Sequence, residues 1–361
     1  MSKIRFRLML IMSLFVLVSS FATVMAQDSV DVVVLLPDSA SSARWEADDR
    51  RFLAEAFEEA GVSYSIVNAE GDRQTQITQA EQAITNGARV LLMVNLDSGS
   101  GAAIIDLARD AGVAIIDYDR LTIEGEGADY YVSFNNEAVG RLQGEGLVAA
   151  VDAAIEAGEI EGTPEVAVLN GSPTDNNATL FRNGYFSVIG PKFDSGEWEL
   201  VAEQSVPDWD NQQALVIFEQ MQTDNPGIDA AIAANDGLAQ AVITARQSAD
   251  LPYIPVTGQD ATVGGIQNVL AGYQSMTVYK AIRAEARAAA GLAIAILNNN
   301  IAAIELMVGG NTTNNGTNDI PSILLVPQSV TMNNVVDTVI ADGFRTLEEV
   351  CVGEFADVCP E

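Results

Sequence analysis

Residues 113–120 read VAIIDYDR, an apolar run that ends in an acid and a base, Asp119 and Arg120. A short apolar run bounded by polar residues is typical of a buried strand. The same arrangement recurs four times, with polar or aromatic side chains within a few positions after residues 32–39, 166–173, 228–234 and 254–259. Ligands of open α/β sheets bind outside the carboxyl ends of the strands. These five run ends therefore predict one shared binding site.

The segments between the apolar runs have helical spacing. In residues 44–60, Trp45, Phe52 and Phe57 fall on one helical face, and Gly61 follows as a stop signal. Strand and helix patterns alternate in this way along most of the chain, with short links between them. Such alternation indicates βαβ units and parallel sheets, so we expect an α/β fold with two doubly wound lobes.

The N-terminus has the pattern of a secretory signal peptide. Three basic residues within 1–7 precede an apolar run at 8–18 and a small-residue cleavage motif at 24–26. Cleavage after residue 26 would leave a periplasmic or otherwise extracytoplasmic protein. An uncleaved membrane anchor is the alternative, because residues 8–26 are nearly long enough to span a bilayer.

Composition excludes several classes of function. The formal charge of -32 disfavours nucleic acid and anionic membrane surfaces as partners. The chain has no histidine, so Ser-His and Cys-His nucleophile activation are impossible. It also lacks a P-loop, a GxGxxG turn and a GxSxG elbow. We therefore expect neither an enzyme nor a cofactor or metal site.

Two cysteines, Cys351 and Cys359, lie in a short acidic tail. In an exported protein their spacing favours a local disulfide. Zinc binding is the weaker alternative, because two thiols without histidine make a poor zinc site.

Eight motifs in order carry a resemblance to a known family. They are ARWEADDRRF (43–52), NGARVLLMV (86–94), AIIDYDR (114–120), YYVSFNNEAVGRLQG (130–144), LNGSPTDNNATLFRNG (169–184), AANDGLAQAVI (233–243), VTGQDA (256–261) and SMTVYK (275–280). The set resembles the periplasmic D-xylose-binding proteins of ABC transporters, within the type I sugar-binding family. The resemblance runs from about residue 30 to about residue 346, and the cysteine tail departs from it.

The resemblance implies a division of the chain. It predicts a periplasmic binding protein of type I, with two Rossmann-like parallel-sheet lobes joined by a three-strand hinge. A signal peptide at 1–26 would precede an N-terminal lobe of 27–136 plus 281–314 and a C-terminal lobe of 137–280 plus 315–346. Residues 347–361 would form the cysteine-containing tail.

The resemblance also assigns ligand contacts on the two lobes. They are Arg44, Trp45, Asp119 and Arg120 in the first lobe, and Asn176, Asn177, Arg182, Trp209, Asn235, Asp236, Asp260 and Lys280 in the second. The residue types suit a neutral sugar, because carboxylates accept, arginine and lysine donate, and asparagine does both. Tryptophan would cover the apolar faces of the ring. Alternatively, Trp45 is plain core, Arg182 pairs with Asp175, and the strand-end acids and amides form turns or helix caps.

The expected function is capture of D-xylose, or a closely similar monosaccharide, by hinge closure and its delivery to an ABC permease. We expect a monomer with no nucleic-acid partner and no cofactor. One alternative is a sugar sensor that signals to a chemoreceptor or kinase, and another is a glucose- or ribose-type ligand on the same scaffold. A carboxylate-based glycosidase is disfavoured, because the strand-end acids are mixed with arginine and asparagine.

Overall fold

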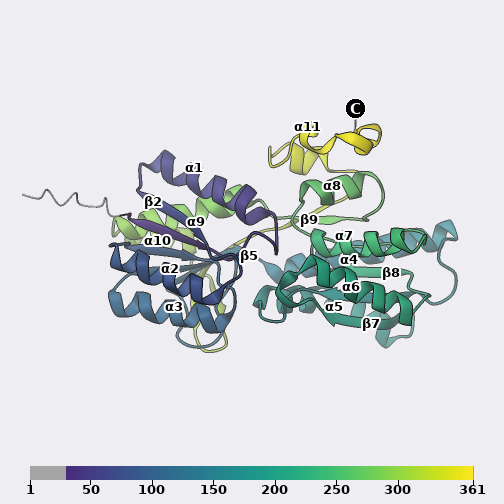
Figure 1. Cartoon of the computed structure of the whole chain (residues 1–361), viewed down its shortest axis with the longest axis horizontal. Coiled ribbons are helices and arrows are strands. Elements are labelled where there is room, and N and C mark those ends of the chain that lie inside the picture. The colour runs from purple at the N-terminus through teal and green to yellow at the C-terminus, as the bar shows by residue number, and fades with distance from the viewer. Residues whose placement is uncertain (1–29, 361) are drawn as a thin grey trace, which may run out of the picture.

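The computed structural model describes residues 30–360, and the predicted signal peptide lies outside these described residues. The chain forms two α/β lobes side by side, with the C-terminal segment above one of them (Figure 1). No helix among residues 30–360 is both long and apolar enough to cross a bilayer.

The first lobe is built on a seven-stranded sheet. Its order is β10-β11-β5-β4-β3-β1-β2, and the strands are parallel apart from the antiparallel pair β10–β11. The strands are β1 (Val32–Leu36), β2 (Tyr64–Asn68), β3 (Val90–Met93), β4 (Ala114–Tyr118), β5 (Tyr130–Phe134), β10 (Thr312–Asn314) and β11 (Asp319–Leu325).

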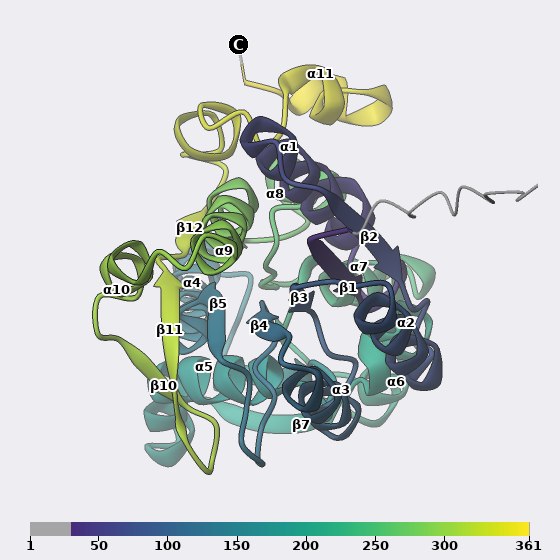
Figure 2. The same cartoon turned by 90° about the vertical axis from the view of Figure 1, so that its left-hand side faces the viewer.

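Helices cover both faces of this sheet, which explains why β1 is apolar at every position (Figure 2). Val32 and Val34 point into one core with the helices α1 and α9, whereas Val33 and Leu35 point into the other with α2 and α3. The helices of the first lobe are α1 (Arg50–Ala60), α2 (Arg73–Thr85), α3 (Ser98–Ala111), α9 (Ile282–Leu297) and α10 (Ile301–Val308).

The second lobe has a smaller parallel sheet of order β7-β6-β8, beside the antiparallel pair β12–β9. The strand predicted at residues 254–258 forms only a single bridge, between Val256 and Ala231. The strands are β6 (Glu165–Asn170), β7 (Glu199–Ser205), β8 (Ala230–Ala233), β9 (Thr277–Tyr279) and β12 (Gln328–Val330). The helices are α4 (Asn136–Ala157), α5 (Asn176–Asp194), α6 (Asn211–Asp224), α7 (Asp236–Ser248) and α8 (Val263–Leu270).

Several polar residues that follow strands start the next helix. The side chains of Asp97, Asn135, Asp175 and Asn235 accept hydrogen bonds from backbone N–H groups in the first turns of α3, α4, α5 and α7. These residues are therefore N-caps, as the sequence allowed. Capping occupies one side-chain oxygen and leaves the other atoms of the group for further contacts.

The chain passes between the lobes three times within residues 30–360, from β5 to α4, from β9 to α9 and from β11 to β12. This matches the expected three-strand hinge. One predicted boundary is wrong, however, because β11 belongs to the first lobe, where residues 322–325 pair with β5. The Asn- and Gly-rich stretch 309–318 contains β10 and forms a hairpin with β11. Helices α9 and α10 return the chain to the edge of the first sheet, and the second lobe begins again only at β12.

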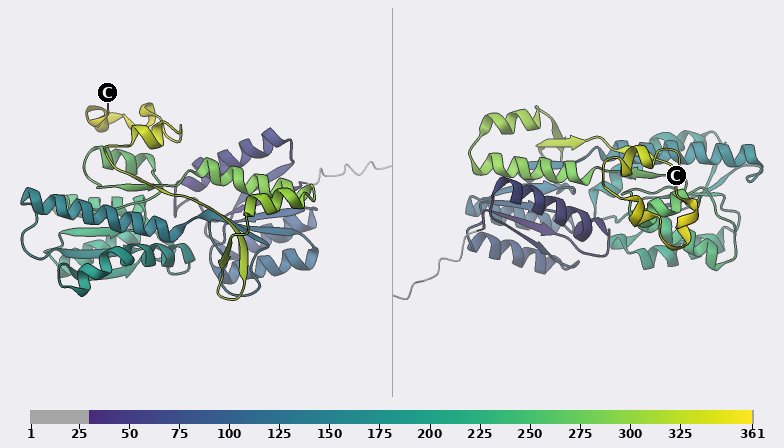
Figure 3. Two further views of the ribbon diagram at one scale, coloured as in Figure 1. Left: turned by 180° about the vertical axis from the view of Figure 1, so that it is seen from behind. Right: turned by 90° about the horizontal axis from the view of Figure 1, so that it is seen from above.

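The last segment contains the π-helical turn η3 (Val336–Ile340), α11 (Leu347–Val350) and the 3-10 turn η4 (Gly353–Val358). A disulfide joins Cys351 and Cys359, with their Cα atoms 5.8 Å apart. The segment packs against α8 of the second lobe (Figure 3).

Candidate functional site

A small cavity of about 30 Å³ lies between the lobes, at the carboxyl ends of the strands. Its volume is about the share of one water molecule in the liquid. Nine of the twelve predicted contact residues line it: Arg44, Trp45, Asp119, Arg120, Asn177, Trp209, Asn235, Asp260 and Lys280. The predicted strand ends therefore do converge on one place.

Arg44 forms the base of the cavity on the first-lobe side. It immediately precedes the π-helical turn η1 (Trp45–Asp49) and is 2 % exposed. Its guanidinium contacts three carboxylates, those of Asp119 at 2.7 Å and of Asp49 and Glu285 at 2.8 Å. Burial raises the pKa of Asp49, and also that of Glu285, despite the opposing effect of Arg44. These fixed donors and acceptors hold Arg44 in one orientation.

Asp119 connects this arginine to the other side of the cavity. It follows β4 with a left-handed backbone (φ 62°), a conformation that aspartate tolerates better than most residues. Burial alone would raise its pKa, but the charges of Arg44, Lys280 and Arg120 outweigh burial and lower the pKa. Asp119 is therefore an ionised hydrogen-bond acceptor at neutral pH.

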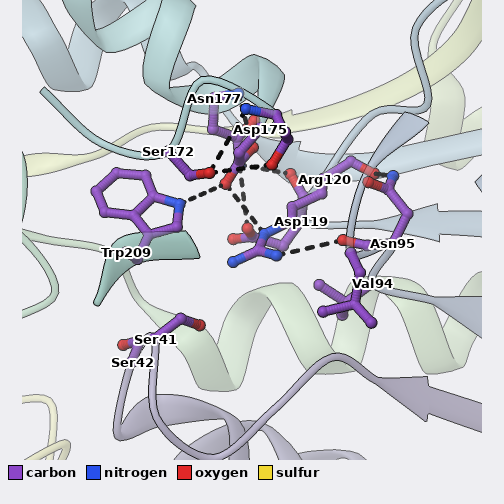
Figure 4. A network of polar contacts seen from close by, with 12 residues as sticks. Ser41, Ser42, Val94, Asn95, Asp119, Arg120, Ser172, Asp175, Asn177 and Trp209 are labelled. Carbon is purple, nitrogen blue, oxygen red and sulfur yellow. Dashed lines mark hydrogen bonds and ion pairs between the residues drawn. The ribbon is translucent and has the colours of Figure 1, made fainter. Parts of the chain in front are cut away.

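Asn177 and Arg120 each make polar contacts that cross directly from lobe to lobe (Figure 4). Asn177 of α5 donates from Nδ2 to both the Oδ1 and the main-chain oxygen of Asp119, at 3.1 and 3.0 Å. The guanidinium of Arg120 lies 3.0 Å from the carboxylate of Asp175 and also donates to the carbonyl of Asn95. In this closed form, donors and acceptors of the two lobes make hydrogen bonds with one another at the place where a polar ligand would bind.

Lys280 and Asp260 form the second-lobe side. Lys280 Nζ lies 3.1 Å from Asp260 and 3.8 Å from Asp119. Burial would lower the pKa of Lys280, but the two carboxylates keep it raised. Ser42 of the first lobe donates to Asp260 at 3.3 Å. Asp260 thus receives donors from both lobes.

Aromatic rings surround these polar groups. Trp209, at the end of the 3-10 turn η2 (Pro207–Trp209), is 5 % exposed and donates from Nε1 to Asp175 at 3.1 Å. The outer edge of its six-membered ring lies against Gly171, where an added Cβ would overlap it. Trp45 lines the same cavity, and the Arg44 guanidinium lies 4.5 Å from its ring centroid. Trp45 is thus both core and cavity wall.

The charges that line the cavity balance. Three cations, Arg44, Arg120 and Lys280, face three carboxylates, Asp119, Asp175 and Asp260. A balanced set of donors and acceptors beside aromatic rings suits an uncharged ligand with several hydroxyl groups. Within residues 30–360, no group of three or more Cys, Asp or Glu side chains is arranged to hold a metal ion.

Three predicted contacts lie outside the cavity. The side chain of Arg182 is 44 % exposed and pairs with Glu203 at 2.6 Å, because it points from α5 to the strand β7. Asn176 lies at the start of α5 beside a separate hollow. The buried carboxylate of Asp236 accepts hydrogen bonds from Thr262, Gln274 and Thr277 of its own lobe, so it has no lone pair left for a ligand. These three assignments are corrected accordingly.

Other cavity residues were not predicted. Phe181 follows Asn177 by four positions on α5, so helical periodicity could have placed both on one face. Gln259 is 3 % exposed and its Oε1 has no hydrogen-bond partner. Ser41 and Ser42 lie in the loop before η1 and gave no sequence signal. Asp175, which the alternative interpretation paired with Arg182, pairs with Arg120.

Comparisons with known proteins agree with this geometry. Residues 32–301 match the model of the periplasmic binding protein domain family. The chain is 36% identical to the D-xylose-binding periplasmic protein of Escherichia coli over 85% of this chain and 88% of that protein. It is 35% identical to the protein of the same name from Haemophilus influenzae, with the same coverage.

A solved structure is also similar. It is a carbohydrate transporter solute binding protein from Chloroflexus aurantiacus in complex with D-glucose. The likeness has a TM-score of 0.78 and 28% identity, and it covers 89% of this chain and 98% of the other.

Proposed function

This chain belongs to the periplasmic binding protein family, and we propose that it captures D-xylose, or a closely similar monosaccharide, between its two lobes. The observation that carries the proposal is the cavity lining. Three buried cations, three buried carboxylates and two tryptophans provide donors, acceptors and apolar faces for one sugar ring. A site with all hydroxyls paired selects strongly, because a buried polar group left unpaired costs about 1–3 kcal/mol.

Binding requires the lobes to separate and close again. The closed cavity has about 30 Å³, and the contacts of Asn177 and Ser42 cross it directly. A sugar would replace such protein contacts with its own hydroxyls. The sugar then favours closure only by the difference between its affinities for the closed and the open form. The three crossings near the hinge allow this movement without unfolding either lobe.

We further propose delivery of the sugar to an ABC permease outside the cytoplasm. The relatives named above are periplasmic binding proteins, which supports this location and a binding role without catalysis. Glucose is the second candidate ligand, since it occupies the similar Chloroflexus protein. Xylose is preferred because the two D-xylose-binding relatives are 36% and 35% identical to this chain, whereas the glucose-bound protein is 28% identical.

Calorimetric titration of the chain from Gln27 with xylose, glucose, ribose, arabinose and galactose tests the proposal. We expect xylose to bind with micromolar or lower Kd, and glucose to bind more weakly. Tighter binding of glucose would replace the assigned sugar and keep the function. Absence of heat with all five sugars, in protein shown to be folded, would overturn the sugar assignment.

A further inference from the structure

The segment after β12, residues 331–360, forms what we call the C-terminal bracket. Val350 is fully buried in it, and the carbonyl of Val350 accepts a hydrogen bond from Gln267 of α8 at 2.9 Å. The disulfide between Cys351 and Cys359 closes its end. The bracket is therefore fixed to the second lobe.

One arginine of the bracket reaches the first lobe. Arg345 donates from Nη1 and Nη2 to the two carboxylate oxygens of Asp48, at 2.8 and 2.7 Å. Both residues are buried, with exposures of 8% for Arg345 and 1% for Asp48. The other cation near Asp48 is Arg51, which is half-exposed and 3.5 Å away. Beside the pair, Phe344 packs against Phe52 of α1.

The same guanidinium also holds the ligand loop of the second lobe. Arg345 Nε donates to the carbonyl of Ala261 at 3.2 Å, and Ala261 follows Asp260 directly. On the other side, Asp48 belongs to the turn η1, which begins directly after Arg44. A single side chain thus connects the segments that place Arg44 and Asp260 at opposite walls of the cavity.

We propose that Arg345 is a positioning residue that locks the lobes in the closed form and slows release of the ligand. The inference rests on the proposed sugar binding. Opening the lobes pulls Asp48 away from Arg345, and a buried charge that loses its partner is strongly disfavoured until water reaches it. This adds to the barrier for opening. Breaking this ion pair adds little to the barrier for sugar binding, because Asp48 and Arg345 are already apart in the open form.

Stopped-flow tryptophan fluorescence with xylose tests the proposal in Arg345→Ala, Asp48→Asn and the double variant Asp48→Asn/Arg345→Ala. We expect koff to rise about tenfold in each single variant while kon stays within about twofold. The double variant should resemble the single ones, because all three lose the same contact. Arg345→Lys should fall between wild type and Arg345→Ala, since lysine pairs with Asp48 without the two-pronged fork. Arg141→Ala, which removes an exposed ion pair on α4, is the matched control.

Two results would overturn the proposal. One is an unchanged koff in variants whose thermal unfolding is altered, which would leave Arg345 a purely structural role. The other is additivity of the two substitutions in koff. If wild type binds no sugar at all, the proposed function fails separately. The bracket is then judged by small-angle X-ray scattering of the ligand-free chain, where a larger radius of gyration in Arg345→Ala than in wild type supports the lock and equal radii reject it.

Discussion

Asp119 combines contacts from both lobes in one residue. Its carboxylate accepts from Arg44 of its own lobe and from Asn177 of the other, and its main-chain oxygen accepts from Ser133 and Asn177. The left-handed backbone after β4 turns both groups toward the cavity. An unusual backbone conformation is retained here because the surrounding contacts fix it. The hydrogen bonds of the site therefore depend more on where the individual oxygen atoms of Asp119 lie than on the residue type.

At the scale of single residues, substitutions of two residues of α5 should have different effects on the affinity for xylose. Asn177→Ala should raise the Kd for xylose at least tenfold, because it removes a buried donor from the cavity and leaves Asp119 short of a partner. Arg182→Ala should change the Kd less than threefold, because Arg182 is exposed and pairs with Glu203. Titration calorimetry of both variants measures the difference. A large loss of affinity in Arg182→Ala alone would mean that the lobes close in another register.

At the scale of elements, the ends of strands and turns position the side chains that line the cavity. The strand β6 ends at Asn170, and the loop after it brings Gly171 under the ring of Trp209. The turn η2 carries Trp209 with a left-handed backbone, at φ 55°. The ring is held in place by contact of its outer edge with Gly171 and by the hydrogen bond from Nε1 to Asp175. The position of the Trp209 ring in the cavity wall thus depends on residue 171 having no side chain.

Gly171→Ala should therefore displace the Trp209 ring. We expect the Kd for xylose to rise about tenfold or more, because the added methyl group overlaps the indole and the core leaves no room for it. Tryptophan emission should also shift, since the indole becomes more exposed. Gly190→Ala is the matched control: this glycine lies in α5, where an added Cβ would make only an ordinary contact with Phe186 at 3.9 Å, and its variant should bind normally. Normal affinity in Gly171→Ala would show that the ring is not a wall of the sugar site.

The whole molecule carries a large negative charge and several buried carboxylates. Asp117 is fully buried, and burial raises its pKa to about 7 although Thr122 donates two hydrogen bonds to it. Burial likewise raises the pKa of Asp236 to about 6. In the unfolded chain both groups titrate near pH 4. Between pH 4 and 7 the folded state therefore binds protons that the unfolded state does not.

This difference fixes the sign of the pH dependence. The free energy of unfolding should fall as the pH rises from about 4 to 7, by up to about 4 kcal/mol for Asp117 alone. Below about pH 4, stability should fall again, because protonation of Asp119 weakens its ion pairs. Urea unfolding at several pH values measures this curve. Asp117→Asn should flatten the slope between pH 5 and 7, whereas the exposed Asp106→Asn, which removes the same charge, should leave it unchanged. Equal slopes in wild type and Asp117→Asn would contradict the assignment.

The sequence by itself determined the alternation of strands and helices and the two-lobed α/β class, because apolar runs, caps and stop signals are local patterns. The nine predicted contacts that line the cavity were assigned by the resemblance of ordered motifs to a known family. Only the tertiary structure decided that β11 joins the first sheet, that Asp236 is saturated within its own lobe and that Arg182 faces Glu203. The contact of Arg345 with Asp48, 297 positions apart, also appears only in the fold. Such pairings depend on the direction of a side chain from its element and on the packing of distant segments. Periodicity shows which residues of a helix share a face, but it does not show which distant segment that face packs against.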